Sequence, residues 1–195
     1  MFPPYTVAQF KPHSTKCNES QQQNELNRAF HQEEEMTVVV SDLTYVRVDK
    51  KWQYVCVFVD LFNREIVGFS TGPNKGALLV YRALASIKVD LNKIQLFHTD
   101  RGNEFKNKLI DDALKTFNIQ RSLSMKGCPY DNAVAEATFK IIKTEFVKGR
   151  HFNSLAELTR EFQDYVHWFN NIRIHGTLGY ASPIDYKHRH LKKIV

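Results

Sequence analysis

Cysteine is scarce in this sequence, and its spacing excludes two common uses of that residue. The chain has 195 residues and three cysteines, Cys17, Cys56 and Cys128. An odd number of cysteines without a Cys-x-x-Cys pair argues against both a disulfide framework and a cysteine-based zinc site. This usage is typical of a reducing compartment, and we predict a cytoplasmic protein.

Long apolar runs and internal repeats are also missing. The first five residues, Met1 to Tyr5, lack the basic segment followed by an apolar stretch that marks a secretory signal. No apolar run approaches the roughly 20 residues that a membrane-spanning helix needs. We therefore expect no membrane partner.

Negative charge is the smaller share of the charged residues. There are 27 Lys and Arg against 21 Asp and Glu, which gives a net charge of +6. A basic balance favours a polyanionic partner such as DNA, because each cation that meets a phosphate releases counterions. A merely soluble basic protein would show the same balance. Hydrophobic residues make up 43% of the chain, enough for the core of one domain.

The texture of the sequence changes near residue 37. Residues 1–36 are rich in Gln, Asn, Glu and Lys and show no apolar period, so we predict a linker or an arm lying on the core. Residues 37–186 carry the periodic apolar pattern of a folded core. Residues 187–195 form a basic tail, which we expect to follow a nucleic-acid backbone without reading sequence.

The core pattern predicts an α/β domain. Three β-branched or apolar runs separated by polar turns indicate an antiparallel meander, and strands then alternate with helices. This order predicts a mixed five-stranded sheet flanked by helices. The predicted strands cover residues 37–48, 54–59, 66–70, 94–98 and 119–123, and the predicted helices cover residues 77–87, 109–117 and 132–148, with a last long helix that begins at a capping box in residues 154–157.

Three carboxylates fall at positions where such a sheet places its sites. Asp42 lies within the first strand, Asp100 follows a later strand, and Glu136 lies in the first turns of the long helix. Strand ends and adjoining helices converge, so we expect these three side chains to meet. Phosphoryl transfer on DNA uses two hard cations about 3.5–4 Å apart, and Mg²⁺ prefers oxygen ligands. Taken singly, each acid is more often a turn, cap or helix-dipole residue.

The sequence around the acids is more specific than the acids themselves. The segments are Asp42-Leu43-Thr44-Tyr45, His98-Thr99-Asp100-Arg101-Gly102, and Asp131-Asn132-Ala133 followed by Glu136, with thirty-five residues between Asp100 and Glu136. Together with residues 60–68, 165–170, 173, 175, 178, 182, 183 and 186, they resemble the integrase-like transposases of the bacterial insertion-sequence family three. The resemblance covers about three quarters of the chain. These proteins share a ribonuclease-H-like core with retroviral integrases.

The resemblance implies a metal-dependent polynucleotidyl transferase. Asp42 and Asp100 would share ligation of two Mg²⁺ or Mn²⁺ ions, and Glu136 would complete the site. Water would first cleave DNA at the element's end, and the resulting 3′-hydroxyl would attack another phosphodiester without a covalent protein–DNA intermediate. The implied partners are DNA ends and target DNA, a homo-multimer assembled on DNA, and a protein that supplies end recognition.

Candidate DNA contacts surround the acids. Lys143 follows Glu136 by seven residues, nearly two helical turns, so the two side chains share a face. Lys140 follows Glu136 by four residues and would either contact DNA or pair with that acid. Arg101 would bind phosphate or a neighbouring acid, and Arg173, with His175, is a candidate to face DNA.

Other residues of these motifs have structural interpretations. We interpret His98 as structural, because Mg²⁺ selects oxygen ligands. Asp131 and Asn132 are predicted to cap the long helix and to fix the preceding loop. The aromatic residues Tyr165, Trp168 and Phe169 are predicted to lie in the core.

Two departures from the family pattern leave alternatives open. Val38 to Val40 stand where the family has a Trp, and residues 1–36 show neither a helix-turn-helix pattern nor a His/Cys zinc module. We therefore expect a catalytic-core fragment. One alternative is a purely hydrolytic nuclease on the same site, and another is a truncated, inactive or regulatory chain that binds DNA or full-length transposase.

Overall fold

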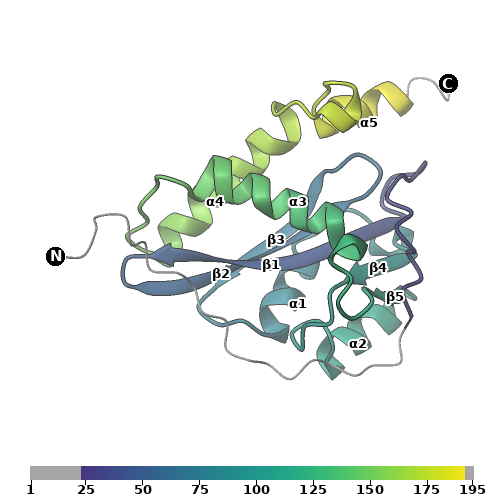
Figure 1. Cartoon of the computed structure of the whole chain (residues 1–195), viewed down its shortest axis with the longest axis horizontal. Helices are drawn as coiled ribbons and strands as arrows, with labels where there is room; N and C mark the ends of the chain where they lie inside the picture. The colour runs from purple at the N-terminus through teal and green to yellow at the C-terminus, as the bar shows by residue number, and fades with distance from the viewer. Residues whose placement is uncertain (1–22, 192–195) are drawn as a thin grey trace.

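A mixed five-stranded sheet forms the centre of the molecule (Figure 1). The computed structural model describes residues 23–191. The strands are β1 (Val38–Val48), β2 (Lys51–Asp60), β3 (Ile66–Gly72), β4 (Leu96–Thr99) and β5 (Gln120–Leu123), and their spatial order is β3-β2-β1-β4-β5. The first three are antiparallel neighbours, whereas β4 and β5 run parallel to β1. The predicted α/β class, meander and mixed sheet are confirmed.

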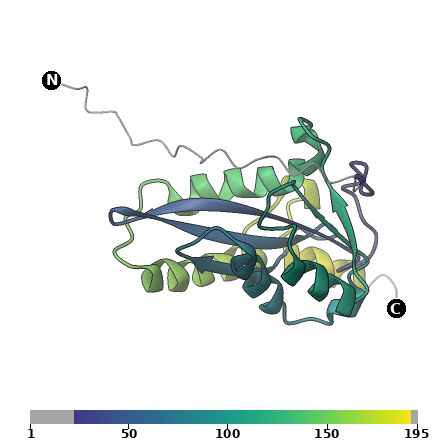
Figure 2. The same ribbon diagram turned by 90° about the horizontal axis from the view of Figure 1, so that it is seen from below.

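Helices cover both faces of this sheet (Figures 1 and 2). They are α1 (Ala77–Ala85), α2 (Lys108–Thr116), α3 (Ala133–Ile142), α4 (Leu155–Asn171) and α5 (Pro183–Leu191). The capping prediction for α4 is confirmed, because Ser154 Oγ accepts a hydrogen bond from the Glu157 backbone N–H at 3.1 Å. Asn118 ends the α2 region in a left-handed conformation with φ 53°, as expected of a helix stop.

The alternation of side chains along β1 decides which face each residue serves. Val38, Val40 and Val46 belong to one buried cluster, and Val39 belongs to the other. Side chains in a strand alternate between faces with a period of two. Asp42 therefore shares the face of Val40, which is the face covered by α3.

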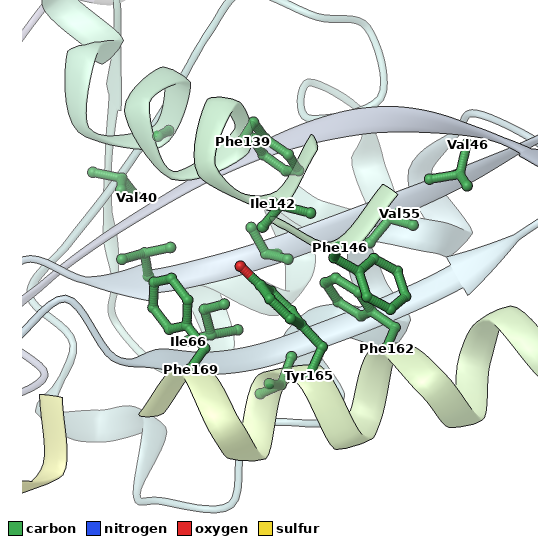
Figure 3. Close-up of a cluster of buried hydrophobic side chains, with 14 of the residues drawn as sticks. Val40, Val46, Val55, Ile66, Phe139, Ile142, Phe146, Phe162, Tyr165 and Phe169 are labelled. Carbon is green, nitrogen blue, oxygen red and sulfur yellow. The ribbon is translucent and has the colours of Figure 1, made fainter. Parts of the chain in front are cut away.

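The larger core lies between this face of the sheet, α3 and α4 (Figure 3). Phe146 lies in a π-helical turn, Lys143–Val147, that continues α3, and its ring packs 5.3 Å from that of Phe162 on α4. Tyr165 and Phe169 are buried as predicted, but Trp168 is not: its residue is 39% exposed. The prediction that Trp168 lies in the core was wrong because its place on α4 turns it away from the buried side.

The segments before and after the predicted core, which are the N-terminal arm and the C-terminal tail, are in part packed on it. Leu26 is buried, and its backbone N–H donates to Ser122 Oγ on β5 at 3.1 Å. Helix α5 crosses the boundary that we drew between residues 186 and 187. The parts of the expected arm and tail at residues 1–22 and 192–195 lie outside the described residues. Among residues 23–191, no helix has both the length and the apolar composition needed to cross a bilayer.

Candidate active site

Asp42 is held on the central strand of the sheet. It is paired with Val57 of β2 in the antiparallel register, and its Oδ1 accepts a hydrogen bond from the Leu43 N–H at 2.7 Å. Burial is the first cause that raises the pKa of this carboxyl to about 7, and the nearby negative charge of Asp100 is the second. Glu104 and Glu136 raise the pKa of Asp42 further. The ionised carboxylate thus lies in a place that disfavours it unless a cation is added.

Asp100 stands directly after β4, the strand next to β1. Its Oδ1 accepts the Gly102 N–H at 2.8 Å, which fixes the tight turn that follows the strand. Burial raises the pKa of Asp100, the Gly102 N–H lowers it, and Glu104 and Glu136 raise it again. The parallel pairing of Ser41 with Thr99 brings Asp42, in the interior of β1, beside Asp100, which directly follows the end of β4.

Glu136 lies in the first turn of α3 and is exposed. Lys140 and Lys143 are exposed as well, and no ion pair joins Lys140 to Glu136 within the described residues. The Lys143 ammonium lies 4.6 Å from the centroid of the Tyr45 ring on β1. This cation–π contact directs Lys143 toward the strand that carries Asp42.

The three acids line one pocket of about 430 Å³. The pocket also contains the cations Lys75, Arg101 and Lys126. The three acids therefore share one pocket, and their meeting at a shared ion stays a prediction. In residues 23–191, however, no three His, Cys, Asp or Glu side chains lie close enough together to hold one ion. The donors are carboxylates, which match the oxygen preference of Mg²⁺, a cation often bound by one or two carboxylates plus water and substrate phosphate.

His98 is structural, as its neighbours show. Its Nε2 lies 3.0 Å from the Asp131 carbonyl oxygen, and its Nδ1 lies 2.8 Å from Ser122 Oγ. A carbonyl can only accept, so in the neutral ring Nε2 carries the proton and Nδ1 accepts from the Ser122 hydroxyl. Burial lowers the pKa of His98 to about 4, which keeps the ring neutral near pH 7.

The loop before α3 is fixed by Asp131, whereas the predicted cap of the helix is wrong. Asp131 Oδ2 accepts the Met125 N–H at 2.9 Å, and Oδ1 accepts from Arg28 Nε at 2.7 Å. Asn132 occupies the cap position of α3 without a side-chain capping bond. Asp131 binds the loop instead of the helix because its carboxylate already has these two donors.

The other predicted DNA contacts differ in where they lie. Arg101 lines the pocket, and its Nε donates to the Ser124 carbonyl at 2.8 Å. Arg173 lies apart from the pocket and forms a two-pronged ion pair with Glu145, with a shortest distance of 2.7 Å. His175 is buried against Phe169, with ring centroids 4.8 Å apart, so the alternative that it faces DNA is wrong.

Three charged residues of the pocket region, Lys75, Lys126 and Glu104, were not predicted from the sequence. Lys75 lines the pocket, and its Nζ lies 2.9 Å from Oε1 of the buried Glu104. The sequence signal for this pair was weak: Glu104 lies two residues after the segment His98 to Gly102, and Lys75 lies in a Pro- and Gly-containing loop before α1. A lysine in such a loop usually has no defined partner, so only the fold reveals this pair.

The sheet order and the pocket together define a class of protein. Acids from the first strand, the end of the fourth strand and the first turn of α3 converge on one ribonuclease-H-like scaffold, the catalytic core of a polynucleotidyl transferase. Two models described as "Integrase core domain" match residues 32–129 and residues 136–191. The chain belongs to this integrase core domain family, and its curated relatives place it among transposases of bacterial insertion sequences.

Two relatives and one solved structure illustrate the likeness. A transposase of insertion sequence element IS904 from Lactococcus lactis is 31% identical over 91% of this chain and 72% of its own length. Transposase InsF of insertion sequence IS3A from Escherichia coli is 34% identical over 77% of this chain. The catalytic core domain of HTLV-2 integrase, solved in complex with magnesium, has a TM-score of 0.59 at 15% identity and covers 77% of this chain and 95% of its own.

Coverage of the relatives differs. The chain covers 72% of the Lactococcus transposase but only 53% of the Escherichia coli transposase, about half of its length. The solved integrase core, at 15% identity, supports the fold. The two matching family models together contain the five strands and the three acids.

Proposed function

We propose that this chain catalyses metal-dependent cleavage and strand transfer of DNA at the pocket formed by Asp42, Asp100 and Glu136. The single observation that carries the proposal is the convergence of these three acids, from separate elements, in one pocket. The raised pKa of Asp42 supports it, because burial and neighbouring acids leave that carboxylate in need of positive charge.

The three acids have different parts in this proposal. Asp42 within β1 and Asp100 after the end of the adjacent β4 bind two Mg²⁺ or Mn²⁺ ions between them. Glu136, on the exposed first turn of α3, completes the ligand set by a movement of its side chain or of α3, with water and DNA phosphate supplying the remaining oxygens. The ions, when bound, activate the attacking oxygen and stabilise the leaving oxygen of the phosphodiester.

The residues around the acids hold the DNA. Lys140 on α3 and Lys143 at the start of the π-helical turn that follows are both exposed, and they contact backbone phosphates. Arg101 contributes from the pocket wall, while its Nε stays bonded to the Ser124 carbonyl. Arg173 makes such a contact only if its ion pair with Glu145 opens, so we assign it the smallest part of the four.

Assembly on DNA follows from the reaction. Two ends of an element must be brought together before transfer, so we propose that at least two copies of the chain act on one DNA complex. Recognition of the end sequence is assigned to a partner protein, since the described residues show no helix-turn-helix among α1 to α5.

A strand-transfer assay tests the proposal. The chain is incubated with pre-cleaved ends of its own element, a plasmid target, and Mg²⁺ or Mn²⁺. Joined products are expected with the wild-type chain, and none with Asp100→Asn, which keeps the shape of the side chain and removes its charge. Asp112→Asn is the matched control, because Asp112 is an exposed acid on α2 outside the pocket.

Each outcome separates the three functions. Joining that needs Asp100 but not Asp112 supports strand transfer. Nicking of the plasmid without joining, again dependent on Asp100, replaces the proposal by a hydrolytic nuclease. DNA binding with neither reaction, under conditions in which the protein is folded, replaces it by a regulatory fragment.

A further inference from the structure

Lys75 is a charged residue of the pocket to which the proposed reaction assigns no role. It lies in the loop between β3 and α1, and it lines the same pocket as Asp42, Asp100 and Glu136. Its ammonium nitrogen lies 2.9 Å from Glu104 Oε1. The side chain of Glu104 is 7% exposed, whereas that of Lys75 is 43% exposed. One end of this ion pair is thus anchored in the protein and the other faces solvent at the pocket.

The backbone at Gly102 leaves space for the buried carboxylate of Glu104. A Cβ atom at Gly102 would lie 2.5 Å from Glu104 Oε1, so any larger residue there would displace the carboxylate. Gly102 also donates its N–H to Asp100. The turn that positions the catalytic acid therefore also makes room for Glu104. This common support fixes the ammonium group of Lys75 relative to Asp100.

Glu104 by itself is unfavourable for the neighbouring acids. Its negative charge raises the pKa values of both Asp42 and Asp100. The ammonium of Lys75 acts in the opposite direction on Asp100, whose pKa it lowers. A lysine ammonium has three N–H donors, and Glu104 Oε1 uses one of them. The remaining donors are available to a ligand that enters the pocket.

We propose that Lys75 is a substrate-positioning residue whose ammonium binds a DNA phosphate adjacent to the one being attacked, while Glu104 holds it at the pocket wall. The proposal rests on the proposed function, since it assigns DNA to this pocket. Three acids line the pocket and repel a phosphodiester, so a cation at a fixed place is needed to orient the strand. A lysine suits this task because it binds phosphate as a point charge.

The test measures DNA affinity without turnover. End DNA whose attacking 3′-hydroxyl is replaced by hydrogen is titrated with the full chain in Mg²⁺ at several salt concentrations. For Lys75→Gln we expect roughly tenfold weaker binding and a salt slope smaller by about one, the signature of one lost phosphate contact. Lys115→Gln, an exposed lysine on α2, is the matched control and should change neither quantity. An unchanged affinity and slope for Lys75→Gln would overturn the proposal.

A double variant separates phosphate binding from simple neutralisation of Glu104. If Lys75 only neutralises Glu104, then Lys75→Met combined with Glu104→Gln restores wild-type affinity, and the proposal is wrong. If Lys75 binds phosphate, the double variant stays as weak as Lys75→Met. Lys75→Arg, which keeps the ion pair and the charge, should retain most of the affinity and serves if the neutral variants do not fold.

Failure of the proposed function gives a different pattern. In that case the wild-type chain joins no DNA ends in Mg²⁺, whatever the binding experiment shows. A loss of affinity in Lys75→Gln with no joining by the wild type would keep Lys75 as a DNA contact and remove the transferase. Joining by the wild type, together with unaltered binding by Lys75→Gln, would keep the transferase and remove Lys75 as a DNA contact.

Discussion

Two polar regions adjoin strand β4, and they differ in how their polar groups are paired. On one side, buried His98 belongs to a circuit of hydrogen bonds with Ser122, which accepts the Leu26 N–H, and with the Asp131 carbonyl. Arg28, at the exposed end of this circuit, donates to the Asp131 carboxylate. On the other side, two residues after His98, Asp100 faces a pocket that it shares with Asp42 and Glu136. The circuit pairs every donor named here with an acceptor, whereas the pocket brings three acids together within a lining that also includes cations.

This difference separates groups that hold the fold from groups that act on a ligand. A buried polar group with partners stabilises a structure, or at least costs little. Buried carboxylates beside other carboxylates cost stability, and such an arrangement is typical of sites that bind a cation. The circuit also links β4 and β5 to Asp131, which lies two residues before α3 begins. It therefore holds Asp100 and Glu136 in a defined relation, although it contains neither.

The largest expected effect is the loss of strand-transfer activity when an acid of the pocket is replaced. Asp42→Asn should reduce strand transfer by about 10³-fold or more, equivalent to about 4 kcal/mol in the barrier, because a metal ligand is lost. The same change should not reduce stability near pH 7, since burial already disfavours the charged form. Joining assays and urea unfolding measure the two quantities. A variant that is fully active would show that Asp42 does not belong to the site.

The second effect is on stability. His98→Ala leaves the Asp131 carbonyl and the Ser122 hydroxyl without their partner in a buried place. We expect a loss of about 2 to 3 kcal/mol in the free energy of unfolding, from unmet hydrogen bonds and a small cavity. Urea unfolding at pH 7 gives this value, and Asp42→Asn is the control from the other region. Equal stability of His98→Ala and wild type would break the distinction between the two regions.

The third effect is a pair of pH slopes with opposite signs. The folded pKa of His98, about 4, is below its ordinary value of 6.5, so its contribution is complete above pH 6.5 and is lost as pH falls toward 4. The folded pKa of Asp42, about 7, is above its ordinary value of 3.8, so stability falls as pH rises from 4 to 7. Each slope reaches at most about 1.4 kcal/mol per pH unit.

Differences between variants isolate these slopes. Subtracting the His98→Asn unfolding curve from that of the wild type should leave a term that increases between pH 4 and 6.5. The same subtraction with Asp42→Asn should leave a term that decreases between pH 4 and 7. Two difference curves with the same sign would contradict the assignment of the two regions.

The smallest effect concerns Arg28, at the exposed end of the circuit. Its guanidinium meets Asp131, whose other oxygen holds the Met125 N–H. Arg28→Met should leave global unfolding nearly unchanged but speed hydrogen exchange of the Met125 amide, because the carboxylate becomes freer to move. Arg28→Lys should lie between the two. If the Met125 amide exchanges at the wild-type rate in Arg28→Met, the arm has no influence on the loop beside the pocket.

Much of the fold was predictable because local pattern and final structure agree. The β-branched run of β1 and the apolar run of β2 predicted two central strands, and Ser154 with Glu157 marked the start of α4. The three acids were predictable for the same reason, since each lies at a strand or helix position that a sheet brings together. Their likeness to a known family added the specific motif spacing.

What the sequence did not reveal depends on contacts between distant segments. The pairing of Lys75 with Glu104 joins loops twenty-nine positions apart, and that of Arg28 with Asp131 joins residues 103 positions apart. The predicted capping failed at both residues: Asp131 binds Arg28 and the Met125 N–H instead, and Asn132 makes no side-chain capping bond. No local period encodes such choices, which follow from how charges compete once the chain is folded.

Anomalous diffraction from a crystal of the chain with end DNA and Mn²⁺ tests the central claim most directly. The account predicts metal peaks inside the pocket, with one ion within about 2.0–2.2 Å of carboxylate oxygens from both Asp42 and Asp100 and with Glu136 turned toward the site. Saturating Mn²⁺ that leaves this pocket without a peak, or that binds only to acids elsewhere on the chain, would contradict it.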